Sequence, residues 1–187
     1  MAGAVPPQDS HPESHKGSDY FPLSVGNKWQ YVIEDHSDPS VKTVTWRVAR
    51  KEILDGVTVY HLRSTPAQGD DTLDLCEVEG GIRESDSERF VLKDPLHTGD
   101  RWSDVVENPG AEEKSDAFEV VSAGNPCSVG GDTFDDCTTV REDNEAKNVA
   151  SATTYARGIG PVKYVYFTAL HSTAEDTVLT ITSWEIH

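Results

Sequence analysis

The sequence is poor in methionine, cysteine and positive charge, and it contains no long apolar run. Its single methionine is Met1, so a core must be built from Val, Ile, Leu and aromatic side chains, a mixture that favours β-strands. No stretch of about 18 apolar residues is present, and the sequence therefore predicts no membrane-spanning helix. The first residues also lack the apolar segment of a secretory signal peptide, so we expect no signal sequence in this chain.

The charge balance is strongly acidic. The chain has 33 Asp and Glu residues against 16 Lys and Arg residues, which gives a formal net charge of −17. Such a field repels phosphate backbones and anionic membranes, so nucleic acid is not an expected partner. A solvated acidic surface is the favoured interpretation of this charge, and binding of divalent cations or adaptation to high salt are the alternatives.

The motifs of common catalytic and cofactor sites are also missing. The sequence has no HExxH, no GxSxG, no phosphate-binding loop and no dinucleotide fingerprint. Its seven histidines show no dense metal-ligand spacing, and His61, on a predicted strand, is expected to be a hydrogen-bonded structural residue. Acidic pairs such as Glu142-Asp143 lack the pattern of a calcium loop and are interpreted as solvated loop charge. We therefore expect no catalytic residue, no metal ligand and no cofactor.

What the sequence does contain is typical of a folded β domain. Its four Trp, six Tyr and five Phe residues supply large apolar areas for burial. Residues 41–54 and 57–64 read as strands separated by Asp55-Gly56, a strong β-hairpin signal. Further short strands follow at the spacing of a sandwich or barrel. The sequence predicts one all-β, antiparallel domain of about ten strands over residues 19–187, either a curved, barrel-like sheet or a sandwich, after a flexible leader over residues 1–18.

The three cysteines suggest one disulfide. Cys127 and Cys137 flank a short Gly-rich turn, and two cysteines across a hairpin can meet the geometry of a disulfide bond. Such a bond implies an oxidising compartment. Cys76 is then a free thiol that we expect to be at least partly buried. The alternative is three reduced, buried thiols.

An eight-residue pattern, called here the octet, occurs twice. Residues 22–29 (PLSVGNKW) recur as residues 95–102 (PLHTGDRW). The identical positions are Pro22 and Pro95, Leu23 and Leu96, Gly26 and Gly99, and Trp29 and Trp102. Pro ends a preceding pairing, Gly permits the positive φ of a tight turn, and Trp anchors the next strand in the core. The octets therefore predict two similar structural corners with buried indoles. The alternative is that both Trp side chains line a ligand cleft.

Together with two later segments, the octets carry a resemblance to known proteins. Residues 20–31 (YFPLSVGNKWQY), the second octet, residues 131–137 (GDTFDDC) and residues 155–163 (YARGIGPVK) occur in this order. They resemble a loosely defined group of bacterial exported proteins and lipoproteins with PLxxGNxW near the start and YAxGxG near the end. The resemblance spans most of residues 20–165, and it implies a β-rich fold and a secreted, periplasmic or envelope location. It transfers no catalytic residue, and the lipid-bearing cysteine of a lipoprotein is not found near the start of this sequence.

These features favour a non-enzymatic exported protein that binds a partner protein or an apolar ligand on a curved sheet. One alternative is a hydrolase or metal-dependent enzyme whose residues converge only in the fold. Another is a structural module of an envelope assembly. An enclosed apolar cavity would favour the binding protein, and convergent histidines and carboxylates would favour the enzyme. A filled core with a broad exposed apolar patch would favour the structural module.

Overall fold

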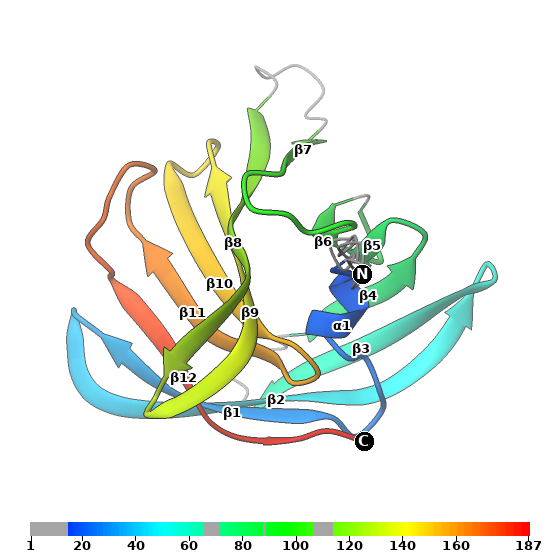
Figure 1. Ribbon diagram of the computed structural model, residues 1–187, viewed down its shortest axis with the longest axis horizontal. Coiled ribbons are helices and arrows are strands. Elements are labelled where there is room, and N and C mark those ends of the chain that lie inside the picture. Colours follow the sequence, from blue (N-terminus) through cyan, green and yellow to red (C-terminus); the bar gives the residue numbers. More distant parts are fainter. Residues whose placement is uncertain (1–14, 66–71, 88, 107–113) are drawn as a thin grey trace, which may run out of the picture.

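A computed structural model describes residues 15–65, 72–87, 89–106 and 114–187 of the chain (Figure 1). The leader predicted for residues 1–18 therefore falls mostly outside the described residues. Its last four residues, 15–18, are described, and here the chain enters a short helix in which Gly17 is buried.

Twelve strands and one helix form within the described residues. The helix α1 spans Gly17–Tyr20. The strands are β1 (Lys28–Asp35), β2 (Asp38–Leu54), β3 (Val57–Thr65), β4 (Thr72–Val78), β5 (Gly81–Glu84), β6 (Phe90–Lys93), β7 (Arg101–Val106), β8 (Lys114–Val129), β9 (Asp132–Asn144), β10 (Val149–Ala156), β11 (Gly160–Phe167) and β12 (Thr177–Glu185).

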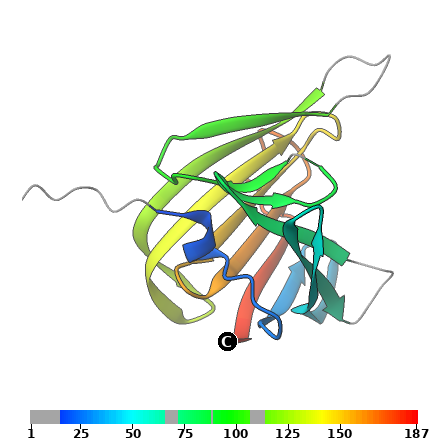
Figure 2. The same ribbon diagram turned by 90° about the vertical axis from the view of Figure 1, so that its right-hand side faces the viewer.

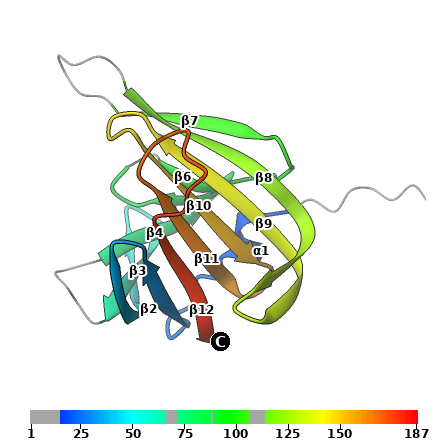
Figure 3. The same cartoon turned by 90° about the vertical axis from the view of Figure 1, so that its left-hand side faces the viewer.

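The twelve strands of the described residues belong to one antiparallel sheet, in the order β6-β5-β4-β3-β2-β1-β12-β11-β10-β9-β8-β7. Figure 1, Figure 2 and Figure 3 show this sheet curling around its own concave side into a nearly closed barrel. The predicted all-β antiparallel fold is confirmed, in its barrel-like form. Twelve strands form in the described residues, where the sequence predicts about ten.

The sheet consists of two six-stranded meanders, β1–β6 and β7–β12, which meet where β1 pairs with β12. Each meander starts at an octet. The Gly26 amide donates to the carbonyl of Val48 at 2.9 Å, and the Gly99 amide donates to the carbonyl of Val120 at 2.8 Å. The two glycines have φ values of +103° and +92°, and the two valines are fully buried on the long strands β2 and β8. The octets thus form the same corner twice.

The equivalence of the two meanders extends beyond the octets. The register of β2 against β3 shifts immediately after Val48. The register of β8 against β9 likewise shifts immediately after Val120. Trp29 lies opposite Trp46 across β1 and β2, and Trp102 lies opposite Phe118 across β7 and β8. Outside the octets, the equivalent valines Val48 and Val120 are identical, whereas Trp46 and Phe118 share only their position opposite an octet tryptophan.

The segment around α1 connects the two meanders on the concave side (Figure 1). The Gly17 amide donates to the carboxylate of Asp94, just after β6, at 2.5 Å. The Tyr20 hydroxyl donates to Asp136 in β9 at 2.6 Å. Phe21 packs edge-on against Trp29, with ring centroids 5.6 Å apart. These contacts to both meanders hold the segment in the core, where Tyr20 is fully buried.

Cys127 and Cys137 are joined by a disulfide, with their Cα atoms 6.0 Å apart. This is the predicted pairing, and it links β8 to β9 near their shared hairpin. Cys76, in β4, is a free and buried thiol whose sulfur lies 3.7 Å from the carbonyl oxygen of Arg83.

Candidate ligand-binding cavity

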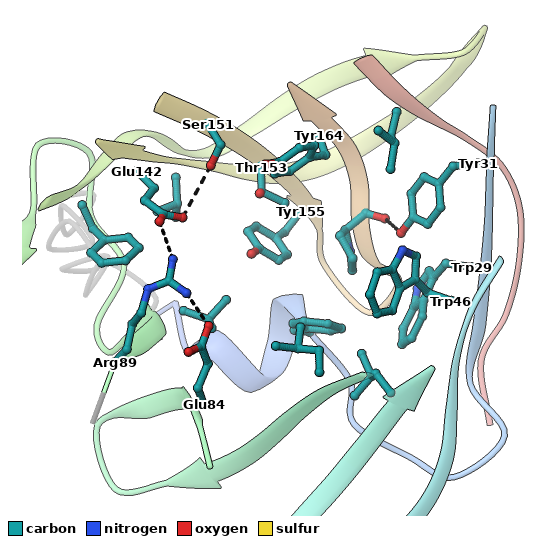
Figure 4. A pocket seen from close by; sticks show the side chains of 18 residues that line it. Trp29, Tyr31, Trp46, Glu84, Arg89, Glu142, Ser151, Thr153, Tyr155 and Tyr164 are labelled. Atoms are coloured by element: carbon teal, nitrogen blue, oxygen red, sulfur yellow. Dashed lines mark hydrogen bonds and ion pairs between the residues drawn. The ribbon is translucent and has the colours of Figure 1, made fainter. Parts of the chain in front are cut away.

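The concave side of the sheet encloses a cavity of about 310 Å³ (Figure 4). Small-molecule sites typically measure about 300–1,000 Å³, so this cavity is at the lower end of that range. Both meanders and the segment after α1 contribute to its walls. The aromatic residues of the lining are Phe21, Trp29, Tyr31, Trp46, Phe118, Tyr155 and Tyr164.

Trp29, Tyr31 and Trp46 form what we call the aromatic end of the cavity (Figure 4). Trp29 and Tyr31 are two positions apart in β1, so both side chains point to the concave side. The indole N–H of Trp29 donates to the carbonyl of Ile159 at 2.6 Å, and the Tyr31 hydroxyl donates to the carbonyl of Pro161 at 2.7 Å. These bonds satisfy the polar atoms of the two rings, so the rings present apolar surface to the cavity.

Three tyrosines of the lining stay neutral at physiological pH. Burial raises the pKa of Tyr31 well above its ordinary value, and the neighbouring Tyr155 adds to this. Burial also raises the pKa of Tyr155 and of Tyr164, although hydrogen bonds with Thr153 and Ser151, respectively, oppose the shift. Their hydroxyl groups therefore add polar contacts without adding charge.

Glu84, Arg89 and Glu142 line the opposite end of the cavity (Figure 4). Together with Asp116, which is not part of the lining, they form what we call the carboxylate–arginine cluster. The guanidinium of Arg89 forms ion pairs with Glu84 through Nη1 and with Glu142 through Nη2. Its Nε lies 3.5 Å from Asp116. The guanidinium also lies over the ring of Phe118, 5.3 Å from the centroid. Both terminal nitrogens of Arg89 therefore pair with carboxylates, whereas the buried Nε forms no hydrogen bond.

Negative charge is in excess in this cluster. Three carboxylates face one guanidinium, so the net charge is −2 when all four groups are ionised. Burial acts to lower the pKa of Arg89, but the three carboxylates outweigh it, and the pKa is raised. Burial raises the pKa of Glu142 despite the opposing effect of Arg89. The side chains of Glu84, Arg89 and Glu142 are 20–25% exposed, so this is the end of the cavity through which solvent has access.

Strand β10 connects the two ends of the cavity. Ser151, Thr153 and Tyr155 alternate along it, and all three line the cavity. The Tyr155 hydroxyl points toward the charged end (Figure 4). The Ser151 hydroxyl donates to Oε2 of Glu142 at 3.5 Å, which is long for an O–H···O bond. This oxygen, unlike Oε1, does not bind Arg89, so it can accept a stronger donor from the cavity.

The octet residues contribute unequally to this site. Trp29 is fully buried and also forms part of the cavity wall. Trp102 is 7% exposed and does not line the cavity, but it stacks on Phe118, which does, at 5.2 Å with an interplanar angle of 3°. Among the described residues, the remaining octet positions are not part of the lining; these are Pro22, Leu23, Gly26, Pro95, Leu96 and Gly99.

Sequence reasoning missed the charged end of the cavity. The interpretation of Glu142 as solvated loop charge is wrong, because Glu142 lies in β9 and lines the cavity beside Val140. The spacing of two between these residues is the signal that could have placed Glu142 on the concave face. Arg89 precedes β6 and belongs to no strand, so no periodic pattern identifies it.

His61 is the hydrogen-bonded structural residue that the sequence predicts. It is buried in β3, with Nδ1 2.7 Å from the carboxylate of Asp74 and Nε2 2.9 Å from that of Glu52. In the described part of the chain, no group of three or more His, Cys, Asp or Glu side chains is arranged to hold a metal ion.

Comparisons with known proteins place this fold in a recognised class. No protein-family model and no curated protein matches the sequence. A crystal structure from Bacteroides fragilis NCTC 9343, of a protein described as exported and as having a YmcC-like fold, is similar with a TM-score of 0.52 and 12% identity. A crystal structure from Parabacteroides distasonis ATCC 8503, of a protein described as a lipoprotein, is similar with a TM-score of 0.51 and 12% identity. Each similarity covers 89% of this chain and 98% of the other.

These similarities show that the chain has the fold of the two proteins, the first of which is described as YmcC-like. They agree with the β-rich fold that the resemblance implies. Within the residues that the structure describes, no helix has the length and apolar character needed to cross a membrane.

Proposed function

We propose that this chain is an exported, non-enzymatic protein that binds a small apolar molecule in the cavity. The observation that supports this proposal is the aromatic cavity itself. Protein interiors are close-packed, with few voids larger than a water molecule. A cavity of about 310 Å³ with aromatic walls and a few polar groups at one end has the features of a ligand site.

The location outside the cytoplasm has separate support. The two similar structures are described as an exported protein and a lipoprotein. The disulfide between Cys127 and Cys137 is of a kind that persists in oxidising compartments. The sequence resemblance to exported proteins and lipoproteins points in the same direction.

Binding can be tested with N-phenyl-1-naphthylamine, a neutral apolar dye that fluoresces more strongly in apolar surroundings. Thr153 lines the cavity, and the variant Thr153→Trp fills part of its volume. Thr154 is the matched control, because it is the next residue in β10, points to the opposite face, and pairs with Thr139 at 3.0 Å. We expect the wild-type chain and Thr154→Trp to bind the dye, and Thr153→Trp to bind it at least about tenfold more weakly.

Dye binding of unchanged affinity in Thr153→Trp, with both variants folded by circular dichroism, would place the binding outside the cavity. An absence of saturable binding in the wild type would contradict the proposal directly.

A second candidate function is acid–base catalysis, and one observation favours it. Glu142 has a raised pKa and shares Arg89 with Glu84, and such perturbed carboxyl groups cluster at catalytic sites. Chromogenic esters, phosphates and glycosides test for this activity. Turnover that is present in the wild type and lost in Glu142→Gln would favour the enzyme, whereas dye binding without turnover of any substrate favours the binding protein.

A further inference from the structure

We propose that the ligand of the cavity is a cationic amphiphile, a small amine whose ammonium group lies at the carboxylate–arginine cluster and whose apolar part lies against the aromatic end. This inference rests on the proposed binding function, and it adds the charge and the orientation of the ligand. It follows from three features: the ion pairs at both terminal nitrogens of Arg89, the excess of carboxylates around it, and the aromatic walls.

Arg89 already has anionic partners at both of its terminal nitrogens. Nη1 pairs with Glu84 and Nη2 with Glu142, and the buried Nε lies 3.5 Å from Asp116 without forming a hydrogen bond. A fatty acid or another carboxylate would have to displace one of these partners and would bring a further negative charge to the cluster. Both steps oppose binding, because like charges at this depth are poorly screened by solvent.

A positive group, in contrast, reduces the charge imbalance. Three carboxylates surround one guanidinium, and Asp104 adds a fourth carboxyl group nearby, on which Lys93 also acts. Burial is the main cause of the raised pKa values of Glu142 and of Asp104, and repulsion from Asp116 adds to both. This second part of each shift reflects an excess of negative charge that a positive charge, such as a proton, reduces. A ligand ammonium group supplies the same charge without protonating a carboxylate.

The geometry offers this ammonium group a place to bind. Oε1 of Glu142 is occupied by Arg89, but Oε2 receives only the long 3.5 Å contact from Ser151. Oε2 of Glu84 likewise receives a long contact, at 3.2 Å, from the hydroxyl of Ser87. An ammonium group has strong donors that shorten such contacts.

The aromatic rings of the walls favour the same ligand. The face of an aromatic ring attracts cations, and Arg89 already uses the ring of Phe118 in this way, at 5.3 Å. Tyr155 lies between the two ends of the cavity (Figure 4). Its ring can contact the cationic group, and Trp29 and Trp46 can contact the apolar part. The volume of about 310 Å³, at the lower end of the usual range for ligand sites, limits the ligand to a small molecule.

Three probes with one carbon skeleton test the inference at neutral pH. They are 4-phenylbutylamine, 4-phenylbutan-1-ol and 4-phenylbutanoate, which are cationic, neutral and anionic, and their dissociation constants are measured by calorimetry. We expect the amine to bind at least about tenfold more tightly than the alcohol, and the alcohol more tightly than the carboxylate. The advantage of the amine should shrink when salt is raised from about 20 mM to about 300 mM, because screening weakens attraction between charges.

The variants Glu84→Gln and Glu142→Gln locate the effect. Each should reduce the preference for the amine over the alcohol several-fold while leaving the affinity for the alcohol nearly unchanged. Glu185→Gln is the matched control, because Glu185 is an exposed carboxylate that pairs with Lys28 at 2.9 Å and does not line the cavity. It should leave the preference unchanged. Using two variants keeps the test decisive if one of them fails to fold.

The outcomes separate this inference from the binding function. Equal affinity for the amine and the alcohol, or tighter binding of the carboxylate, would overturn the cationic ligand and leave the apolar binding site standing. A preference for the amine that persists in both Gln variants would also overturn it, because the charge would then be recognised elsewhere. If none of the three probes binds and the naphthylamine dye fails as well, both proposals fall.

Discussion

Trp102 donates its indole N–H to the carbonyl oxygen of Phe90 at 3.0 Å, across the seam between β6 and β7, the two edge strands of the sheet. The Phe90 amide in turn donates to the carboxylate of Asp104 in β7, also at 3.0 Å. Side chains thus satisfy backbone groups that a neighbouring strand would otherwise bind, which protects the edge from pairing with another chain. Because Arg89 directly precedes Phe90, the same contacts hold the charged end of the cavity in place.

The anchoring role of the octet indoles leads to a first prediction. Trp29→Ala and Trp102→Ala should each lower the free energy of unfolding by about 3–5 kcal/mol, because each removes a large buried ring and leaves a cavity. Trp184→Ala is the control, since Trp184 is 36% exposed, and its loss should cost much less. Urea unfolding followed by circular dichroism measures all three. A change at Trp29 or Trp102 as small as that at Trp184 would show that the octets are not anchors.

The second prediction concerns the glycine of the second octet. Gly99 has a φ of +92°, and a Cβ atom added there would meet nothing within 4 Å. Any cost of Gly99→Ala therefore comes from the backbone conformation and not from a clash, and it should be about 1–2 kcal/mol in unfolding experiments. The control is Val25→Ala, at an exposed position of the first octet. A neutral Gly99→Ala variant would contradict the requirement for positive φ in the corner.

Much of the fold was predictable because its signals are local. The Asp55-Gly56 turn, the octet glycines and the cysteines across the β8–β9 hairpin each act over a few residues, and each pattern has a physical cause within that span. The order of the meanders was not predictable, since it depends on β1 pairing with β12 at the far end of the chain.

The candidate site was less predictable than the fold. Its charged end combines Arg89 from a loop with Glu142 from the other meander, and no local pattern indicates that these residues meet. The aromatic end was partly predictable from the sequence, which indicates a buried Trp29 and, as the alternative, a Trp29 that lines a ligand cleft; in the structure Trp29 is buried and also lines the cavity.

The third prediction is a pH dependence at Tyr20, whose hydroxyl donates to Asp136 at 2.6 Å. Burial, and then this hydrogen bond, raise the pKa of Tyr20 to about 12. The neutral hydroxyl therefore makes its full contribution to the free energy of unfolding below the ordinary tyrosine pKa of 10.0, and this contribution is lost as the pH rises toward 12. At pH 8 or so, Tyr20→Phe should be less stable than the wild type by about 1–2 kcal/mol.

The difference in free energy of unfolding between Tyr20→Phe and the wild type should then shrink above a pH of about 10, because only the wild type loses the stabilisation by the Tyr20 hydroxyl. Urea unfolding at several pH values measures this difference directly, since other tyrosines titrate in both proteins. A difference that stays constant up to a pH of about 11.5 would contradict the coupling of Tyr20 to the folded state.

The fourth prediction concerns Arg89 as the counter-charge of the cluster. Arg89→Met leaves Glu84, Asp116 and Glu142 without their shared cation. Removing one partner of a fully buried ion pair costs about 3–5 kcal/mol, and we expect a smaller loss here because these side chains are 10–25% exposed. The double variant Arg89→Met/Glu142→Gln should recover part of the loss, since it removes one of the unpaired charges.

The pH dependence of Arg89→Met has a definite sign. Without the guanidinium, which opposes the effect of burial, the pKa of Glu142 rises further in the folded state, so the protonated form stabilises the fold at low pH and this stabilisation is lost as the pH rises. The variant should therefore approach the wild type as the pH falls from about 7 to about 4.5. Arg101→Met is the control, because Arg101 is 72% exposed and its pair with Glu119 should contribute less than about 1 kcal/mol at any pH. Equal effects of the two substitutions on the free energy of unfolding would mean that Arg89 does not hold these carboxylates together. A difference between Arg89→Met and the wild type that grows as the pH falls would mean the same.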